Sequence, residues 1–136
     1  MGRGARRRVV GTDLGRRALT QVRRGEVRVV DFDPARGSEA AKRRPAVIVS
    51  NDQANSVAQR LGKGVLTVVP ITSNVQRVYP FQVFLPAGTA SLRIDSKAQA
   101  EQVRAIAIGR IGELLGVAPA SIMRSLDQAL RLHLAL

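Results

Sequence analysis

The stretch EVRVVDFDPARGSEAAKRRPAVIVSN, residues 26–51, decides the fold because it holds two β-strand patterns on either side of a polar loop. Its first part, EVRVVDFD, alternates apolar and polar side chains and is followed by Pro34, which predicts a strand closed by a turn. Its last part, PAVIVSN, is short, nearly all apolar and β-branched at its centre, which predicts a buried strand that starts at Pro45. The domain is therefore expected to begin as a β structure.

The patterns that follow extend this β structure and end it with a helix. Ile122, Leu126, Leu130 and Leu134 recur at steps of four, which predicts an amphipathic helix over residues 119–136. Several closely spaced strands followed by a C-terminal helix are typical of the α+β class, here a small, mainly antiparallel barrel packed by that helix. The other elements expected are one or two helical turns over residues 52–61, with Asn51 or Asp52 as N-cap, and strands over residues 64–74, 79–86 and 91–107.

The charge of the chain is strongly positive and unevenly spread. Its 136 residues fit one domain, and 22 Lys and Arg against 10 Asp and Glu give a formal net charge of +12, which favours a polyanion or an acidic protein as partner. Residues 1–24 carry eight arginines and one aspartate, whereas residues 25–136 carry 14 basic and 9 acidic side chains. We therefore expect a basic, disordered extension over residues 1–22 and a folded domain over residues 23–136. The extension is either a flexible arm that binds nucleic acid or the product of a translation start assigned too far upstream.

The composition excludes most catalytic and metal-binding sites. The chain has no cysteine, which excludes disulfides, thiolate catalysis and cysteine zinc sites, and its only histidine, His133, lies near the end of the expected C-terminal helix. The sequence contains no HExxH, paired-histidine or DxD pattern, so we expect neither a metal nor a cofactor. No apolar run approaches the roughly 20 residues that cross a bilayer, and the Arg-rich start lacks the pattern of a secretory signal. The expected location is the cytoplasm, with no membrane partner.

Arg44 and Thr72 are the candidates left for chemistry. Pro45 fixes its own φ and biases Arg44 to extended geometry, so the guanidinium leaves the loop in a defined direction. Thr72 ends the predicted strand in VVPIT, where a hydroxyl emerges beside Ser73 and Asn74. Thr72 also fits the ordinary role of a side chain that satisfies a turn.

Four segments, RRGEVRVVDFDPARGSEAAKRRPAVIVSN, VVPITSN, FQVFL and AEQVRAI, together resemble the MazF/PemK (Kid) family of toxin endoribonucleases, from about Arg23 to the C-terminus. The motifs RGE, DPxxGSE, RRP and EQxR recur in order at family-like spacing. The resemblance implies an SH3-like barrel of the CcdB/PemK type, a homodimer, and sequence-selective, metal-independent cleavage of single-stranded RNA that leaves 2′,3′-cyclic phosphate and 5′-hydroxyl ends. The implied partner is a small MazE-like antitoxin with an acidic, disordered tail, and operator DNA is reached only through that antitoxin.

The resemblance also implies an active site, made of the arginine of the RP step and a threonine after the third strand, which are Arg44 and Thr72 here. Attack of a ribose 2′-OH on the adjacent phosphate builds negative charge that a guanidinium is suited to meet, and Thr72 would donate a hydrogen bond to the same phosphate. Because arginine stays protonated, another group must take the 2′-OH proton, and Glu39 and Glu101 are the candidates, unless both only orient arginines. In the Kid branch, a catalytic arginine and a catalytic acid occupy the positions of Gln99 and Glu101. The acid is kept here but glutamine replaces the arginine, so the sequence looks closer to the MazF branch.

RNA contacts are expected mainly from polar side chains, because the aromatic content is only 3% and single-strand binders usually stack bases on aromatic rings. Tyr79 is the candidate for stacking, with a surface tyrosine at a strand edge as the alternative, and Phe81 and Phe84 are expected in the core. The residues expected to bind RNA are Lys42, Arg43, Asn51, Ser73, Asn74, Gln76, Arg77 and Tyr79.

Two other functions stay open at this point. A CcdB-like toxin on a similar barrel would act on DNA gyrase and would cut no RNA. A basic, non-catalytic RNA- or DNA-binding module would bind in a salt-sensitive way and leave RNA intact.

Overall fold

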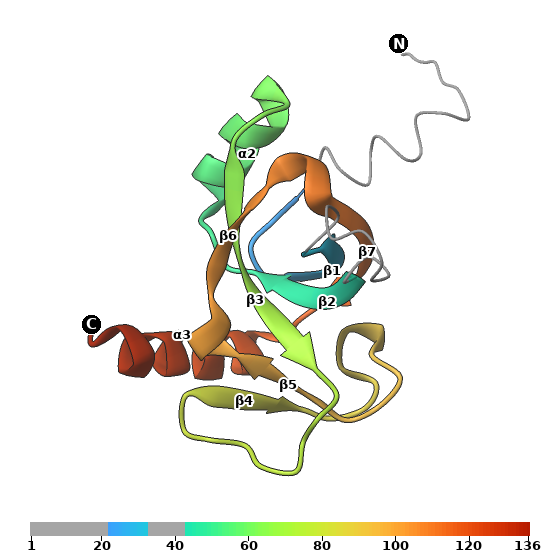
Figure 1. Cartoon of the computed structure of the whole chain (residues 1–136), viewed down its shortest axis with the longest axis vertical. Coiled ribbons are helices and arrows are strands. Elements are labelled where there is room, and N and C mark those ends of the chain that lie inside the picture. The colour runs from blue at the N-terminus through green and yellow to red at the C-terminus, as the bar shows by residue number, and fades with distance from the viewer. Residues whose placement is uncertain (1–21, 33–42) are drawn as a thin grey trace.

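The computed structural model describes residues 22–32 and 43–136 (Figure 1). Short strands dominate this part of the chain, with one helix after the second strand and one at the end. The elements are β1 (Glu26–Asp31), β2 (Arg43–Ile48), α2 (Asp52–Leu61), β3 (Val65–Thr72), β4 (Gln82–Leu85), η1 (Thr89–Ser91), β5 (Ser96–Gln99), η2 (Ala100–Gln102), β6 (Arg104–Ala107), η3 (Ile108–Arg110), β7 (Ile111–Val117) and α3 (Ala120–Leu134), where η marks a 3-10 turn.

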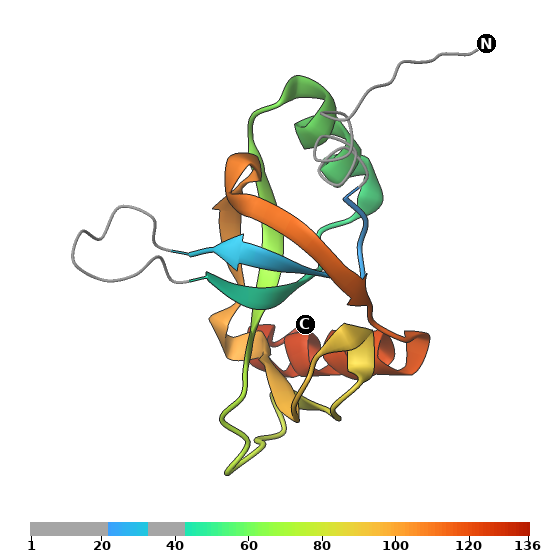
Figure 2. The same ribbon diagram turned by 90° about the vertical axis from the view of Figure 1, so that its right-hand side faces the viewer.

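The strands of the described part form one antiparallel, seven-stranded sheet in the order β4-β5-β3-β2-β1-β7, and β6 pairs with β3 outside this order. The two ends of β3 have different neighbours, because Val65–Val68 pair with β6 whereas Ile71 and Thr72 pair with β5. Figures 1 and 2 show α2 at one end of the sheet and α3 lying across the other. The prediction of a mainly β, antiparallel α+β fold with a C-terminal helix is confirmed.

Two hydrophobic clusters stabilise the sheet from its two faces. Consecutive strand residues point to opposite faces, so Val47 of β2 joins the first cluster and Ile48 joins the second. The first cluster is closed by α3, whose Leu126 is completely buried, a contribution of about 1.5–3 kcal/mol. The second cluster includes Val22, which is 2% exposed, so the packed domain extends to this residue. Side chains on both faces therefore hold β2 rigidly.

The first strand carries a buried ion pair. Arg28 is 1% exposed, and its Nε donates to Glu26 Oε1 at 2.8 Å. Its Nη1 also donates to the backbone oxygen of Gly112 at 3.0 Å, which connects β1 to β7. The charge of Arg28 is therefore compensated within the sheet.

The structure differs from the sequence-based expectation in residues 91–117. A single strand over residues 91–107 is wrong, because the chain forms β5, turns at η2 and then forms β6 on the other half of β3. The sequence patterns did not indicate β7, where Leu114 and Val117 are exposed and Gly112 and Gly116 interrupt the apolar run.

Smaller corrections concern element starts and burial. β2 begins at Arg43, two residues before the expected start at Pro45. Phe84 is 41% exposed, so its expected place in the core is wrong, and Phe81 is only half-buried. Leu134 is exposed beyond the packed part of α3. Within the described ranges, no helix combines the length and the apolar composition needed to cross a membrane.

Candidate active site

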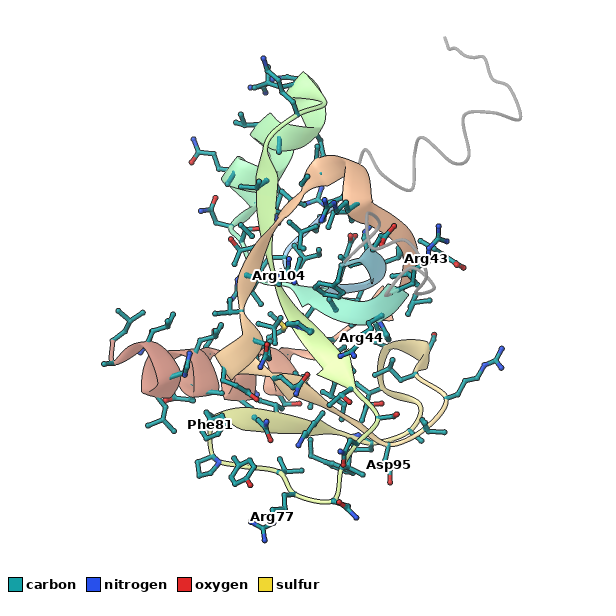
Figure 3. All side chains as sticks on the ribbon, in the orientation of Figure 1. Arg43, Arg44, Arg77, Phe81, Asp95 and Arg104 are labelled. Atoms are coloured by element: carbon teal, nitrogen blue, oxygen red, sulfur yellow. The ribbon has the colours of Figure 1, made fainter. Side chains whose placement is uncertain are left out.

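Arg44 and Thr72 line one pocket of about 380 Å³ at the end of β3, called here the Arg44 pocket. β2 and β3 pair with Ala46 opposite Pro70, and continuing this register by two residues on each strand brings Arg44 opposite Thr72. Side chains two residues apart on a strand share a face, so Arg44 and Thr72 point to the same side of the sheet. Figure 3 shows Arg44 beside the end of β3. The cation and the hydroxyl that the sequence singled out separately therefore share one cavity.

Thr72 is held in a turn and still has a proton to donate. The backbone N–H of Asn74 donates to Thr72 Oγ1 at 3.2 Å, which is the turn role expected of such a residue. The hydroxyl oxygen is the acceptor in this bond, so its own O–H is available to a ligand. The turn fixes the position of the hydroxyl at the mouth of the Arg44 pocket.

The facing wall of the Arg44 pocket comes from the segment between η1 and β5. Arg93 and Ile94 line this wall together with Ser96, which is 4% exposed and donates from Oγ to the Ile94 backbone oxygen at 3.0 Å. Arg44 and Arg93 make no ion pair with any described residue, and no acid is among the described residues that line the pocket. Two uncompensated guanidinium groups suit a phosphate. Sequence reasoning missed Arg93 and Ser96, because neither belongs to a motif.

A second pocket of about 460 Å³, called here the Lys97 pocket, adjoins the first. Ser73 and Ser96 line the Arg44 pocket, and the residues that follow them, Asn74 and Lys97, line the Lys97 pocket. Thr72 and Lys97 are direct partners in the β3–β5 register. Four of the residues expected to bind RNA are thereby gathered beside the Arg44 pocket. The lining residues are Asn74, Gln76, Arg77, Tyr79 and Lys97.

Other residues expected in the site lie elsewhere. Arg43 is the neighbour of Arg44 in β2, so its side chain points to the opposite face, as the two labels in Figure 3 indicate. Asn51 lies beyond the other end of β2 and acts as the N-cap of α2, its Oδ1 accepting from the Ala54 N–H at 2.8 Å. Neither residue is among those that line the two pockets. Glu39 and Lys42 lie outside the described residues.

Glu101 orients an amide rather than an arginine. Its Oε2 accepts from Gln82 Nε2 at 2.7 Å, and Gln82 Oε1 in turn accepts from the backbone N–H of Tyr79 at 3.1 Å. Its Oε1 is buried with no hydrogen-bond partner among the described residues. Gln99 is half-buried in β5, where its register partner is Gln82. Glu101 therefore supports the loop that carries Tyr79 through Gln82, and neither Glu101 nor Gln99 is among the residues lining the Arg44 pocket.

The part of the chain that the structure describes brings no three His, Cys, Asp or Glu side chains together as metal ligands. What it does bring together is a pair of arginines, a threonine hydroxyl and a neighbouring polar pocket with one aromatic ring. This arrangement can hold a phosphate in the first pocket and a planar group in the second.

The sequence and the fold have well-matched relatives. The profile of the PemK-like, MazF-like toxin of type II toxin-antitoxin systems matches residues 23–134. Endoribonuclease MazF9 of Mycobacterium tuberculosis is 59% identical over 115 residues, which cover 85% of this chain and 98% of that protein. The crystal structure of MazF from Deinococcus radiodurans aligns with a TM-score of 0.66 at 28% identity, over 85% of this chain and 97% of that one. A MazE-MazF crystal structure from the same organism aligns with a TM-score of 0.65 at 25% identity, over 85% and 96% of the two chains. The match over residues 23–134 and the 59% identity to MazF9 show that this chain belongs to the PemK-like, MazF-like toxin family of type II toxin-antitoxin systems.

Proposed function

We propose that this chain is the toxin endoribonuclease of a toxin-antitoxin pair and that it cleaves single-stranded RNA in the Arg44 pocket. The observation that carries the proposal is that Arg44 and Thr72, which come from different strands, line one cavity without an acid among its described lining residues. The named activity of MazF9, which is 59% identical over nearly its full length, supports the same reaction.

The chemistry follows from the charges in the pocket. The ribose 2′-oxygen bonds to the adjacent phosphorus while the bond from phosphorus to the 5′-oxygen breaks, which leaves a 2′,3′-cyclic phosphate and a 5′-hydroxyl. Negative charge grows on the non-bridging oxygens, where the forked N–H groups of Arg44 donate. The Thr72 hydroxyl donates to the same phosphate and helps to keep the attacking and leaving oxygens in line. Arg93 supplies a second positive charge from the facing wall.

The reaction also needs a base that accepts the 2′-OH proton and a donor that protonates the departing 5′-oxygen, which ends as the 5′-hydroxyl. Glu39 remains our candidate for the base, because it stands five residues before Arg44 in the sequence. Glu101 is less suited, since its Oε2 already accepts from Gln82 at 2.7 Å and it is not among the residues lining the Arg44 pocket. The resemblance to the MazF toxins supports proton transfer without a metal ion or other cofactor.

We also propose an acidic-tailed, MazE-like antitoxin as the protein partner and a homodimer as the working form. The uncompensated arginines of the Arg44 pocket suit an acidic peptide as well as RNA, and the MazE-MazF structure supports an antitoxin partner. Val57 and Leu61 of α2 and Val65 of β3 are exposed apolar side chains suited to a contact between two copies. Operator DNA would be bound only together with the antitoxin, and the activity belongs in the cytoplasm, where messenger RNA is translated. Sedimentation of the wild-type chain tests the dimer.

The decisive experiment incubates the purified chain with single-stranded RNA in the presence of EDTA. We expect fragments with 5′-hydroxyl ends, and we expect Arg44→Ala to lower the cleavage rate by at least about 10²- to 10³-fold because a preorganised donor is lost. Arg60→Ala is the matched control, since Arg60 is an exposed arginine in the last turn of α2. Circular dichroism shows whether both variants are folded.

The same experiment distinguishes the proposed mechanism and pocket from the alternatives. Cleavage that EDTA abolishes would refute the metal-free mechanism, and an Arg44→Ala variant as active as Arg60→Ala would refute the assigned pocket. Growth arrest without RNA fragments would favour a gyrase poison. Intact RNA together with tight, salt-sensitive binding would favour a non-catalytic binding module.

A further inference from the structure

Lys97 is a buried cation that the cleavage chemistry does not use. It is 7% exposed in β5, and its Nζ donates to the backbone oxygen of Arg77 at 2.6 Å. No carboxylate of the described residues forms an ion pair with it. Burying an ammonium group is costly unless its N–H groups are satisfied, and the Arg77 oxygen satisfies one of three. Lys97 lines the Lys97 pocket, where its other two N–H groups can meet a ligand.

The Lys97 pocket offers mainly hydrogen-bond donors. Lys97 and Arg77 can only donate, since neither side chain has an acceptor atom. Asn74 can do both, but its Oδ1 already accepts from the backbone N–H of Gln76 at 3.3 Å, which leaves its NH₂ group free. A ligand that enters this pocket therefore meets an environment that favours acceptor atoms.

An aromatic platform closes one side of the pocket. The Tyr79 ring stacks on Phe81 with the centroids 5.3 Å apart and the planes at 2°, and Lys97 Nζ lies 6.0 Å from the Tyr79 centroid. Tyr79 is 42% exposed, so part of the ring is available to another planar group. The hydrogen bonds from Tyr79 N–H to Gln82 and from Gln82 to Glu101 fix the loop that carries the ring. Phe81 and Arg77 mark this loop in Figure 3.

The position of the Lys97 pocket relates it to the cleavage chemistry. Lys97 is the register partner of Thr72, and Cα atoms of such partners are about 5 Å apart. Both pockets are therefore lined by residues at the end of β3 and in β5, two strands that pair directly. An RNA strand with its phosphate in the Arg44 pocket would bring a neighbouring base to the Lys97 pocket.

We propose that the Lys97 pocket binds the base of a nucleotide next to the scissile phosphate and selects a base with a carbonyl edge, uracil or guanine. This proposal rests on the proposed function, which identifies RNA as the substrate, and it adds the chemical class of the base that is recognised. Uracil O4 and guanine O6 and N7 accept hydrogen bonds from Lys97 and Arg77, and the base stacks on Tyr79. Cytosine and adenine carry an amino group at the corresponding position, which would face these donors without a partner.

The first test measures binding and does not depend on cleavage. Tyr79 is the only tyrosine of the chain, so ¹³C-labelled tyrosine gives one assigned ring signal in NMR spectra of the full chain. The probes are uridine 5′-monophosphate and cytidine 5′-monophosphate, which differ at the carbonyl and amino position. We expect the uridine nucleotide to shift this signal at a concentration about 10-fold lower, the difference expected for one hydrogen bond to a charged donor. Equal responses, or no response to either nucleotide, would overturn the proposal.

The second test asks which base is selected during cleavage. A pool of RNA oligonucleotides of random sequence is cut, and the 5′-hydroxyl ends are sequenced. We expect the wild type to prefer uracil or guanine by about 10-fold or more at one position beside the cut. Lys97→Met, which keeps the unbranched stem and removes the donors, should lose this preference and keep the others, and Lys97→Arg should retain it.

The outcomes separate the two proposals. RNA cleavage by the wild type without a carbonyl preference beside the cut, or with a preference that Lys97→Met keeps, would overturn the assignment of the Lys97 pocket and leave the proposed function standing. Absence of cleavage by the wild type would overturn the proposed function, while the NMR titration would still decide what the Lys97 pocket binds.

Discussion

Replacing Gly116 with alanine tests whether η1 sets the shape of the Arg44 pocket. A Cβ atom at Gly116 would lie 2.7 Å from the carbonyl carbon of Ala90 and 2.8 Å from its Cα and oxygen atoms. Ordinary contacts of a Cβ atom begin at 3.4 Å, so one of the two backbones must move by about 0.7 Å. Overpacking of this kind lowers the free energy of unfolding by about 1–3 kcal/mol.

η1 is the segment that we expect to move. Ala90 has φ 48° and Ser91 has φ 66°, so two consecutive non-glycine residues already occupy the left-handed region, at a cost of about 1–2 kcal/mol each. Leu92 and Arg93, which follow directly, line the Arg44 pocket. Because a displacement of about 1 Å in a catalytic site can cost about 10²-fold in rate, we expect Gly116→Ala to slow RNA cleavage by about 10- to 100-fold.

The assay combines urea unfolding with single-turnover cleavage of RNA. Gly109→Ala is the control, since nothing lies within 4 Å of the Cβ that it would add. Adding Ala90→Gly to Gly116→Ala should recover part of both losses, because glycine accepts a positive φ freely and lets η1 adjust. If Gly116→Ala matched Gly109→Ala in stability and in rate, the close approach of β7 to η1 would not control the pocket, and the reasoning would be refuted.

Two further predictions concern acidic residues. Glu26→Gln leaves the guanidinium of Arg28, which is 1% exposed, without its anion, so we expect urea unfolding to show a loss of about 3–5 kcal/mol, part of which Arg28→Met should restore in the double variant. Glu101→Gln should keep the cleavage rate within about 10-fold, because an amide oxygen can still accept from Gln82, whereas a loss beyond about 10³-fold would show that Glu101 takes part in proton transfer.

Two of the strands that the sequence predicts correctly, β2 and β3, carry apolar side chains on both faces. Val47 and Ile48 are both completely buried because a hydrophobic cluster lies on each side of β2, which produces an apolar run without alternation. β7 gives no such signal, since it is an edge strand whose Leu114 and Val117 are exposed. The extended segment is interrupted at η2 because β5 pairs with one half of β3 and β6 pairs with the other half. The local sequence does not contain this pairing information.

Some residues of the candidate site can be predicted from the local sequence, whereas others depend on tertiary contacts. The direction of Arg44 follows from Pro45, and the position of Thr72 follows from the end of an apolar run, so both were accessible from sequence. The role of Lys97 could not be predicted from the sequence, because a lysine in an alternating strand usually faces solvent. Its burial results from the loop that carries Tyr79, and its place beside Thr72 results from the β3–β5 register.

Adjacent residues of β5 line two different pockets. Ser96 lines the Arg44 pocket and Lys97 lines the Lys97 pocket. Lys97 shares a face of the sheet with its register partner Thr72, whereas Ser96 lies on the other face together with Ile71, which also lines the Arg44 pocket. In the proposed arrangement, a change of side chain at Lys97 alters the base that is accepted without changing Ser96, which points to the other face. A slip of the β5 register by one residue would exchange the two positions and disrupt both pockets at once. The pairing of β5 with β3 and β4 on both sides makes such a slip costly, so the two pockets stay fixed in relative position.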